Sequence, residues 1–167
     1  MTELAILVPS RSRPHNIIEL KKSFEETCTS NTKLIVLVDD DDKYLNAYKE
    51  IEGIELIVGP RLRIGGTLNK FAPEIANKYK YIGFLGDDHR PRTHGWDTTF
   101  INELERIKVG IVFGNDLYHK GNLATSATMT SNIVTTLGYI CVPGTTHLFI
   151  DNFWMAIGRG TNITYFD

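Results

Sequence analysis

The segment that decides the fold is YKYIGFLGDDHRP, residues 79–91. Its apolar run from Tyr81 to Leu85 shows no polar alternation, which is typical of a strand buried on both faces of a parallel sheet. The run stops at Gly86, and two carboxylates and an imidazole follow at once. In open parallel sheets, ligands collect at the carboxyl ends of the strands. The segment therefore predicts a buried strand that delivers three polar side chains to a ligand-binding edge.

Upstream of this segment, short apolar runs alternate with stretches of helical periodicity. The apolar runs predict three further buried strands, at residues 4–8, 34–38 and 54–58. Apolar residues at helical spacing predict the intervening helices, at 17–28, 44–51 and 67–78, the last beginning after a turn at Gly65-Gly66. This alternation indicates an α/β fold, with a mostly parallel sheet flanked by helices.

Downstream of residue 91 the alternation is weaker. The pattern predicts helices at 96–107 and 152–157 and strands at 110–113, 139–142 and 163–166, whereas the threonine-rich stretch 123–136 favours neither. No repeat, linker or low-complexity tract divides the chain. We therefore expect one domain over residues 1–167, in which the second half completes the same sheet.

The composition limits the possible functions. A chain of 167 residues has room for one core but not for two ordinary domains. The formal net charge of −2 provides no overall attraction to nucleic acid or to an anionic membrane. Cys28 and Cys141 lack metal-type spacing and are expected to be free thiols. Without a signal-like start or an apolar run of about 18 residues, the sequence predicts a soluble, cytoplasmic protein with no membrane span.

Two polar clusters follow predicted strands, Asp39-Asp40-Asp41-Asp42 and Asp87-Asp88-His89. Each can be a solvated turn, and for four successive, mutually repelling carboxylates that interpretation stays open. The second cluster favours a functional interpretation. Carboxylate oxygens together with an imidazole suit a divalent cation, Mn²⁺ or Mg²⁺, which can neutralise a diphosphate leaving group.

The chain also resembles a known family, the family 2 glycosyltransferases of the GT-A fold. The matching segments, in the family's order, are VPSRSRP (8–14), LVDDDD (37–42), the helix containing Asn69 with YKYIGFLGDDHRP after it (79–91), Gly95-Trp96, and LGYICVPGTTHLFIDNFWMAIGRGTNITY (137–165). His89 takes the last position of the family's Asp-x-Asp motif, and Asp151 matches the aspartate of its Glu-Asp pair. The resemblance implies a nucleotide-binding half over about 1–92 and an acceptor and catalytic half over about 93–167.

The resemblance implies roles for the residues that match. Contacts to a nucleotide-sugar are implied for Pro9, Ser10, Arg11, Arg13, Asp39, Asp40, Asp87 and Asp88. Metal ligands are implied at Asp87, Asp88, His89 and His147, although His147 can instead cap a turn. Asp151 would be the general base, unless it only caps the helix that follows. The cations beside the glycine pair, Arg63 and Lys70, also suit a diphosphate.

The predicted function is metal-dependent transfer of a sugar from a nucleoside-diphosphate sugar, with UDP as the expected nucleotide, to an acceptor hydroxyl with inversion. Two alternatives remain, a nucleotidyltransferase of similar architecture and a catalytically silent nucleotide-sugar binding module. The acceptor is left open among a glycan, a protein and a modified nucleobase. Trp154 is expected in the core, and three histidines are expected at the surface, His15, His94 and His119.

Overall fold

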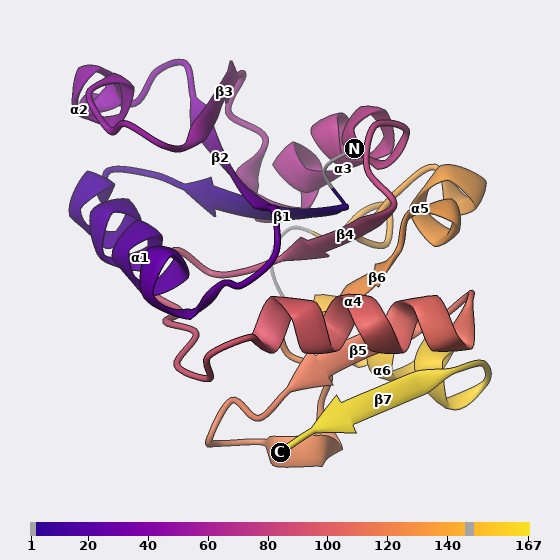
Figure 1. Cartoon of the computed structure of the whole chain (residues 1–167). Helices are drawn as coiled ribbons and strands as arrows, with labels where there is room; N and C mark the ends of the chain where they lie inside the picture. The colour runs from indigo at the N-terminus through magenta and orange to yellow at the C-terminus, as the bar shows by residue number, and fades with distance from the viewer. Residues whose placement is uncertain (1–2, 146–148) are drawn as a thin grey trace.

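The apolar run at the start of the chain forms β1 (Leu4–Ser10), an interior strand of a seven-stranded sheet (Figure 1). The computed structural model describes residues 3–145 and 149–167. The other strands are β2 (Thr32–Asp39), β3 (Glu55–Gly59), β4 (Tyr81–Phe84), β5 (Ile111–Gly114), β6 (Thr128–Thr130) and β7 (Ile163–Phe166). Their order across the sheet is β3-β2-β1-β4-β6-β5-β7. Neighbouring strands are parallel except where β6 pairs antiparallel with β4 and β5.

Helices cover both faces of the sheet (Figure 1). One face packs against α1 (Pro14–Thr27), α2 (Leu45–Lys49) and α4 (Trp96–Ile107), and the other against α3 (Arg63–Ala76), α5 (Ser131–Leu137) and α6 (Ile150–Arg159). The side chains of β1 alternate between the two cores, because successive residues of a strand point to opposite faces. The prediction of an α/β fold with a mostly parallel sheet flanked by helices is therefore confirmed, and strands of the second half join the same sheet.

The helix predicted at 67–78 begins earlier, because Gly65 and Gly66 lie inside α3 and not in a turn before it. Gly65 is buried and continues the helical stripe of Leu68 and Ala72 toward the sheet. A Cβ on Gly66 would lie 2.9 Å from the Leu62 Cβ, so the glycine permits a close approach at the start of the helix.

The strand predicted at 139–142 is wrong, because this apolar segment is irregular. The side chain of Asn69 takes the place of a neighbouring strand: its Oδ1 accepts from the amides of Ile140 and Cys141, and its Nδ2 donates to the Cys141 carbonyl. Trp154, fully buried as predicted, donates from Nε1 to the Ile140 carbonyl at 2.9 Å. These side chains satisfy backbone groups that a strand would satisfy by pairing.

The stretch that favoured neither helix nor strand, 123–136, contributes β6 and most of α5. The short strand β6 fills the gap between β4 and β5, with Met129 fully buried in the core. Within residues 3–145 and 149–167, no helix has the length and apolar character needed to cross a membrane.

The sheet opens at its carboxyl edge between β1 and β4. The two strands pair from Leu4 to Leu7, and the amide of Leu85 still donates to the Leu7 carbonyl, but β1 continues to Ser10 along β2 alone. Pro9, which has no amide hydrogen, is tolerated here because β1 no longer has a partner on the β4 side. The chain order reverses between these strands, so this is the switch point at which α/β sheets bind ligands.

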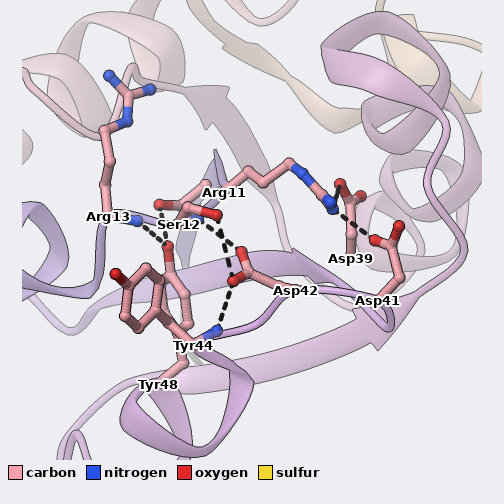
Figure 2. Close-up of polar contacts among 9 residues, drawn as sticks. Arg11, Ser12, Arg13, Asp39, Asp41, Asp42, Tyr44 and Tyr48 are labelled. Atoms are coloured by element: carbon pink, nitrogen blue, oxygen red, sulfur yellow. Dashed lines mark hydrogen bonds and ion pairs between the residues drawn. The ribbon is translucent and has the colours of Figure 1, made fainter.

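The loop between β1 and α1 is held by side chains from the β2–α2 segment (Figure 2). The buried carboxylate of Asp42 accepts from the amides of Ser12, at 2.6 Å, and Tyr44, at 2.8 Å. The hydroxyl of Tyr48, a fully buried residue, accepts from the Arg13 amide at 2.9 Å and lies 2.8 Å from Ser10 Oγ. The loop is therefore pinned at both ends.

A second buried carboxylate, Asp97, joins α4 to the segment before β2. It accepts from the amides of Thr29 and Ser30, both at 3.0 Å, and from Thr32 Oγ1 at 2.7 Å. Burial raises the pKa of the Asp97 carboxyl, but these hydrogen bonds lower it by more, so the pKa lies below its ordinary value of 3.8. The charged form is thus stabilised in the folded chain.

Tyr48→Phe is expected to lower the free energy of unfolding by about 1–2 kcal/mol, since the ring still fills its site but two hydrogen bonds to the β1–α1 loop are lost. Urea denaturation measures the change. The control is Tyr44→Phe, an exposed tyrosine of the same segment, which should stay within about 0.5 kcal/mol of the wild type. Equal effects of the two changes would contradict the pinning role of Tyr48.

Asp97→Asn is expected to cost about 1.5–3 kcal/mol at pH 7, because the hydrogen bonds to a charged acceptor are weakened. The lowered pKa makes the wild-type advantage complete above the unfolded value of 3.8, and this advantage is lost as the pH falls through the folded value. Urea denaturation of both proteins between pH 7 and pH 2.5 should therefore show the two stabilities converging in acid. A constant difference would show that the carboxylate charge is not involved.

Candidate active site

The carboxylate of Asp87 ties the open edge of the sheet together. Its side chain is 1% exposed, and Oδ2 accepts from Ser10 Oγ at 2.7 Å. Oδ1 lies 2.9 Å from Arg13 Nη2 and 3.5 Å from Asn16 Nδ2. Both oxygens therefore face protein groups at the end of β1 and the start of α1, and both are shielded from solvent.

The two residues that follow point outward instead. Asp88 and His89 are exposed, and both side chains lie against Gly86. A Cβ on Gly86 would lie 2.7 Å from Asp88 Oδ1 and 3.3 Å from His89 Nε2. The missing side chain of Gly86 thus leaves a small space toward which a carboxylate oxygen and an imidazole nitrogen converge.

The ring of His89 is oriented by its other nitrogen. Its Nδ1 lies 2.8 Å from Ser126 Oγ, and the opposite edge of the ring, Cδ2 and Nε2, faces Gly86. Arg90 closes the turn, because its Nη1 donates to the carbonyls of Asp87 and His89. An imidazole held through one nitrogen, with the other nitrogen available, is the usual arrangement of a metal-binding histidine.

This donor set suits a divalent cation bound together with a phosphate ligand. One carboxylate oxygen and one imidazole nitrogen fit Mn²⁺, and diphosphate oxygens and water can complete its coordination shell. Among the described residues, no three histidine, cysteine, aspartate or glutamate side chains form a group that could hold a metal by themselves. His147, the further ligand implied by the sequence resemblance, lies outside the described residues.

Arg11 and Asp39 form an ion pair at the ends of β1 and β2 (Figure 2). Arg11 Nη1 lies 2.7 Å from Asp39 Oδ2 and also donates to Asp41 Oδ1. Both contacts use the same nitrogen, which leaves Nε and Nη2 of the guanidinium for other acceptors. Asp40 is exposed beside the pair. The predicted contacts to the nucleoside thus lie together at one side of the carboxyl edge.

Asp151 lies in the first turn of α6, where Phe149 and not Asp151 occupies the N-cap position. Burial raises the pKa of the Asp151 carboxyl above its ordinary value of 3.8, while His89 and the Ser126 amide lower it part of the way. Ser126 thus contacts both the imidazole beside Gly86 and the carboxyl of Asp151. The metal side and the acceptor side of the predicted site meet at this serine.

Two further groups lie near Asp151: Asp116, the carboxylate next in line as a base if Asp151 is not, and His119, for which the sequence predicts no role. His119, predicted to be a plain surface residue, is partly buried, pairs through Nδ1 with Asp116 Oδ2 at 2.8 Å, and lies close enough to Asp151 to influence its charge. Asp116 also accepts from three successive amides, at residues 118, 119 and 120. Burial raises the pKa of Asp116, but these contacts lower it well below its usual range. The spacing Asp116-x-x-His119 was the available signal.

Two predicted cations lie at different places along α3. Arg63 is its first residue, exposed and with a positive φ of 60°, at the carboxyl edge of the sheet. Lys70 is seven residues further on, about 10 Å along the helix, and is also exposed. The other two predicted surface histidines, His15 and His94, are exposed.

Solved structures with the same fold identify the architecture. A mannosyltransferase from Pyrobaculum calidifontis, PcManGT, solved with GDP-Man and Mn²⁺, superposes with a TM-score of 0.71 at 12% identity over 98% of this chain and 54% of its own. TarS from S. aureus, residues 1–349, superposes with a TM-score of 0.66 at 11% identity, over 98% of this chain and 57% of its own. Rv0371C from Mycobacterium tuberculosis, solved with manganese, superposes with a TM-score of 0.57 at 8% identity, over 99% of this chain and 87% of its own.

Neither a protein-family profile nor a curated protein sequence matches this chain. The chain spans a little over half the length of PcManGT and of the TarS fragment. The likeness to these structures extends over nearly all of its own residues. The chain therefore has the same fold as the mannosyltransferase PcManGT, the GT-A fold that the sequence resemblance predicts.

Proposed function

We propose that this chain is a metal-dependent glycosyltransferase, which moves a sugar from a nucleoside-diphosphate sugar to an acceptor hydroxyl with inversion at the anomeric carbon. The observation that supports this most directly is the convergence of Asp88 Oδ1 and His89 Nε2 over Gly86, at the open edge of a GT-A sheet. A divalent cation held there would stabilise the negative charge of the departing diphosphate.

Different residues around this position would contact different parts of the donor. Arg11 and Asp39 offer donors and an acceptor to the nucleoside at the end of β2. Asp88 and His89 would hold the cation against the diphosphate. The sequence resemblance favours UDP, whereas PcManGT was solved with GDP-Man, so both nucleotides belong in the test.

Asp151 is proposed as the general base on the acceptor side. Its raised pKa makes the carboxylate a stronger proton acceptor than an ordinary aspartate. Asp116, the other carboxylate nearby, is occupied by loop amides and His119, which lower its pKa and make it a poor base. A nucleotidyltransferase would use the same metal site without needing Asp151, and a silent binding module would bind nucleotide without turnover.

The first test is calorimetric titration of metal-free protein with UDP and with GDP, with Mn²⁺ or with EDTA. Tight binding should require Mn²⁺, because the carboxylates at the sheet edge otherwise repel the diphosphate. Asp88→Asn should weaken the Mn²⁺-dependent binding by at least about 10-fold while the thermal transition is retained, since the side chain is exposed.

Two further variants serve as a second test of the metal site and as its control. Gly86→Ala should have a similar effect, because the added methyl group would displace Asp88 Oδ1. Glu74→Gln, which removes an exposed carboxylate on α3, should bind as the wild type does. Nucleotide binding of equal strength in Mn²⁺ and in EDTA would remove the metal site and, with it, the proposed reaction.

Asp151→Asn is expected to reduce sugar transfer by about 10²-fold to 10⁴-fold, because the amide cannot accept the acceptor proton. Affinity for the nucleoside diphosphate and the thermal transition should hardly change. Asp116→Asn is the matched comparison and should disturb the loop at residues 116–120 more than the chemical step. Transfer is followed by mass spectrometry with panels of UDP- and GDP-sugars and acceptors. Full transfer by Asp151→Asn would exclude it as the base.

A further inference from the structure

We infer that Arg13 binds the diphosphate of the donor and that buried Asp87 serves to orient Arg13, which leaves metal binding to Asp88 and His89. The inference rests on the proposed function and assigns a role to an ion pair at the open edge that joins the β1–α1 loop to the β4 turn.

The surroundings of Asp87 argue that it is an anchor. Its side chain is 1% exposed, and its two oxygens already face Ser10, Arg13 and Asn16. A metal ligand has to direct a lone pair at the ion, yet the next two residues, Asp88 and His89, are the ones whose side chains are exposed and converge over Gly86. Burial of this carboxylate is tolerable because it is paired and hydrogen-bonded.

Arg13, unlike Asp87, is accessible to solvent. Its side chain is 52% exposed, although its Nη2 lies 2.9 Å from Asp87 Oδ1. A guanidinium has five N–H donors in a planar fork, so a contact through Nη2 leaves Nε and Nη1 for a second anion. One side of the fork is thus fixed by a buried carboxylate, while about half of the side chain remains exposed to solvent.

The place of Arg13 in the fold suits an anion bound next to the cation. Asp87, which holds the guanidinium, immediately precedes Asp88, and adjacent Cα atoms are only about 3.8 Å apart. The Arg13 backbone is pinned by the Tyr48 hydroxyl, so the side chain starts from a fixed point (Figure 2). Arg13 is also the N-cap residue of the 14-residue helix α1, whose positive end adds to the attraction for a phosphate.

Arg11 in the same loop would bind a different part of the donor. Figure 2 shows its side chain extending toward Asp39 and Asp41, in another direction from that of Arg13. The two arginines of the loop therefore serve separate parts of a donor, Arg11 the nucleoside and Arg13 the diphosphate. This separation predicts that loss of Arg13 affects recognition of phosphate groups selectively.

The experiment compares Kd values for UDP and UMP, and for GDP and GMP, in saturating Mn²⁺, together with the Kd for Mn²⁺ alone. Arg13→Gln should weaken the binding of the nucleoside diphosphate by about 10-fold to 100-fold, because charge-assisted hydrogen bonds are lost. It should also remove most of the preference for diphosphate over monophosphate. Affinity for Mn²⁺ alone should change by less than about 2-fold, because Arg13 is not a ligand. Arg13→Lys should restore only part of the preference, since a single ammonium cannot serve both anions as a planar fork can.

Asp87→Asn separates an orienting role from a metal-binding role. As a positioning residue, it should reduce the preference for diphosphate while leaving Mn²⁺ affinity within about 2-fold, and its effect should not add to that of Arg13→Gln in the double variant. Arg106→Gln, which removes an exposed arginine on α4 from its pair with the partly buried Glu103, is the charge-matched control and should bind as the wild type does. If Asp87→Asn does not fold, the two Arg13 variants still decide, because that side chain is half exposed.

Four outcomes overturn the inference. Loss of Mn²⁺ binding in Asp87→Asn, equal to that in Asp88→Asn, would make Asp87 a metal ligand. Additive effects of the Arg13 and Asp87 changes, or an unaltered diphosphate preference in Arg13→Gln, would show that the ion pair only stabilises the fold. Absence of Mn²⁺-dependent diphosphate binding in the wild type would instead reject the proposed function together with the inference.

Discussion

The hydrogen bond from Ser10 Oγ to Asp87 Oδ2 is the contact on which the candidate site depends. Beyond the hydrogen bond from the Leu85 amide to the Leu7 carbonyl, β1 and β4 no longer pair, and the sheet would be open there without another connection. Because the Asp87 carboxylate is buried, it needs partners, and Ser10, Arg13 and Asn16 provide them from the end of β1 and the start of α1. The constraint of neutralising one buried charge therefore fixes the relative positions of the two loops at this edge of the sheet.

The same constraint separates structural from chemical carboxylates. Asp42, Asp87 and Asp97 are buried and hydrogen-bonded, whereas Asp40, Asp41 and Asp88 are exposed at the carboxyl edge. A carboxylate already bonded to the protein stabilises a loop, and one that faces solvent has lone pairs available for a cation or a nucleoside. Neighbours in the sequence thus differ in their surroundings: Asp42 and Asp87 are buried, Asp40 and Asp88 are exposed, and Asp41 is exposed but paired with Arg11.

Loops, and not strand ends, surround Asp151 on the proposed acceptor side. Ser126 has a positive φ of 57° and lies between His89 and Asp151, and Asp116 holds the amides of residues 118–120. Leu117 and Tyr118 on the same loop are 74% and 84% exposed. Backbone conformations of this kind persist only where the surrounding contacts determine them, and they concentrate at functional sites. The geometry around Asp151 thus depends on three segments distant in the sequence.

The sequence by itself determined the α/β class, the strands that precede both acidic clusters, and the prediction that those clusters lie at one edge. These features follow from local patterns, since a parallel strand buried on both faces needs a continuous apolar run and a ligand-binding loop needs polar residues at its end. Tertiary structure alone decided which aspartates are buried, that residues 139–142 form no strand, and that His119 and Ser126 lie near Asp151. The physical reason is that each of these features requires partners 30 to 77 residues away. This holds for the burial of a carboxylate, for the replacement of strand pairing by the Asn69 side chain, and for the approach of His89 to Ser126. No local periodicity encodes such partners.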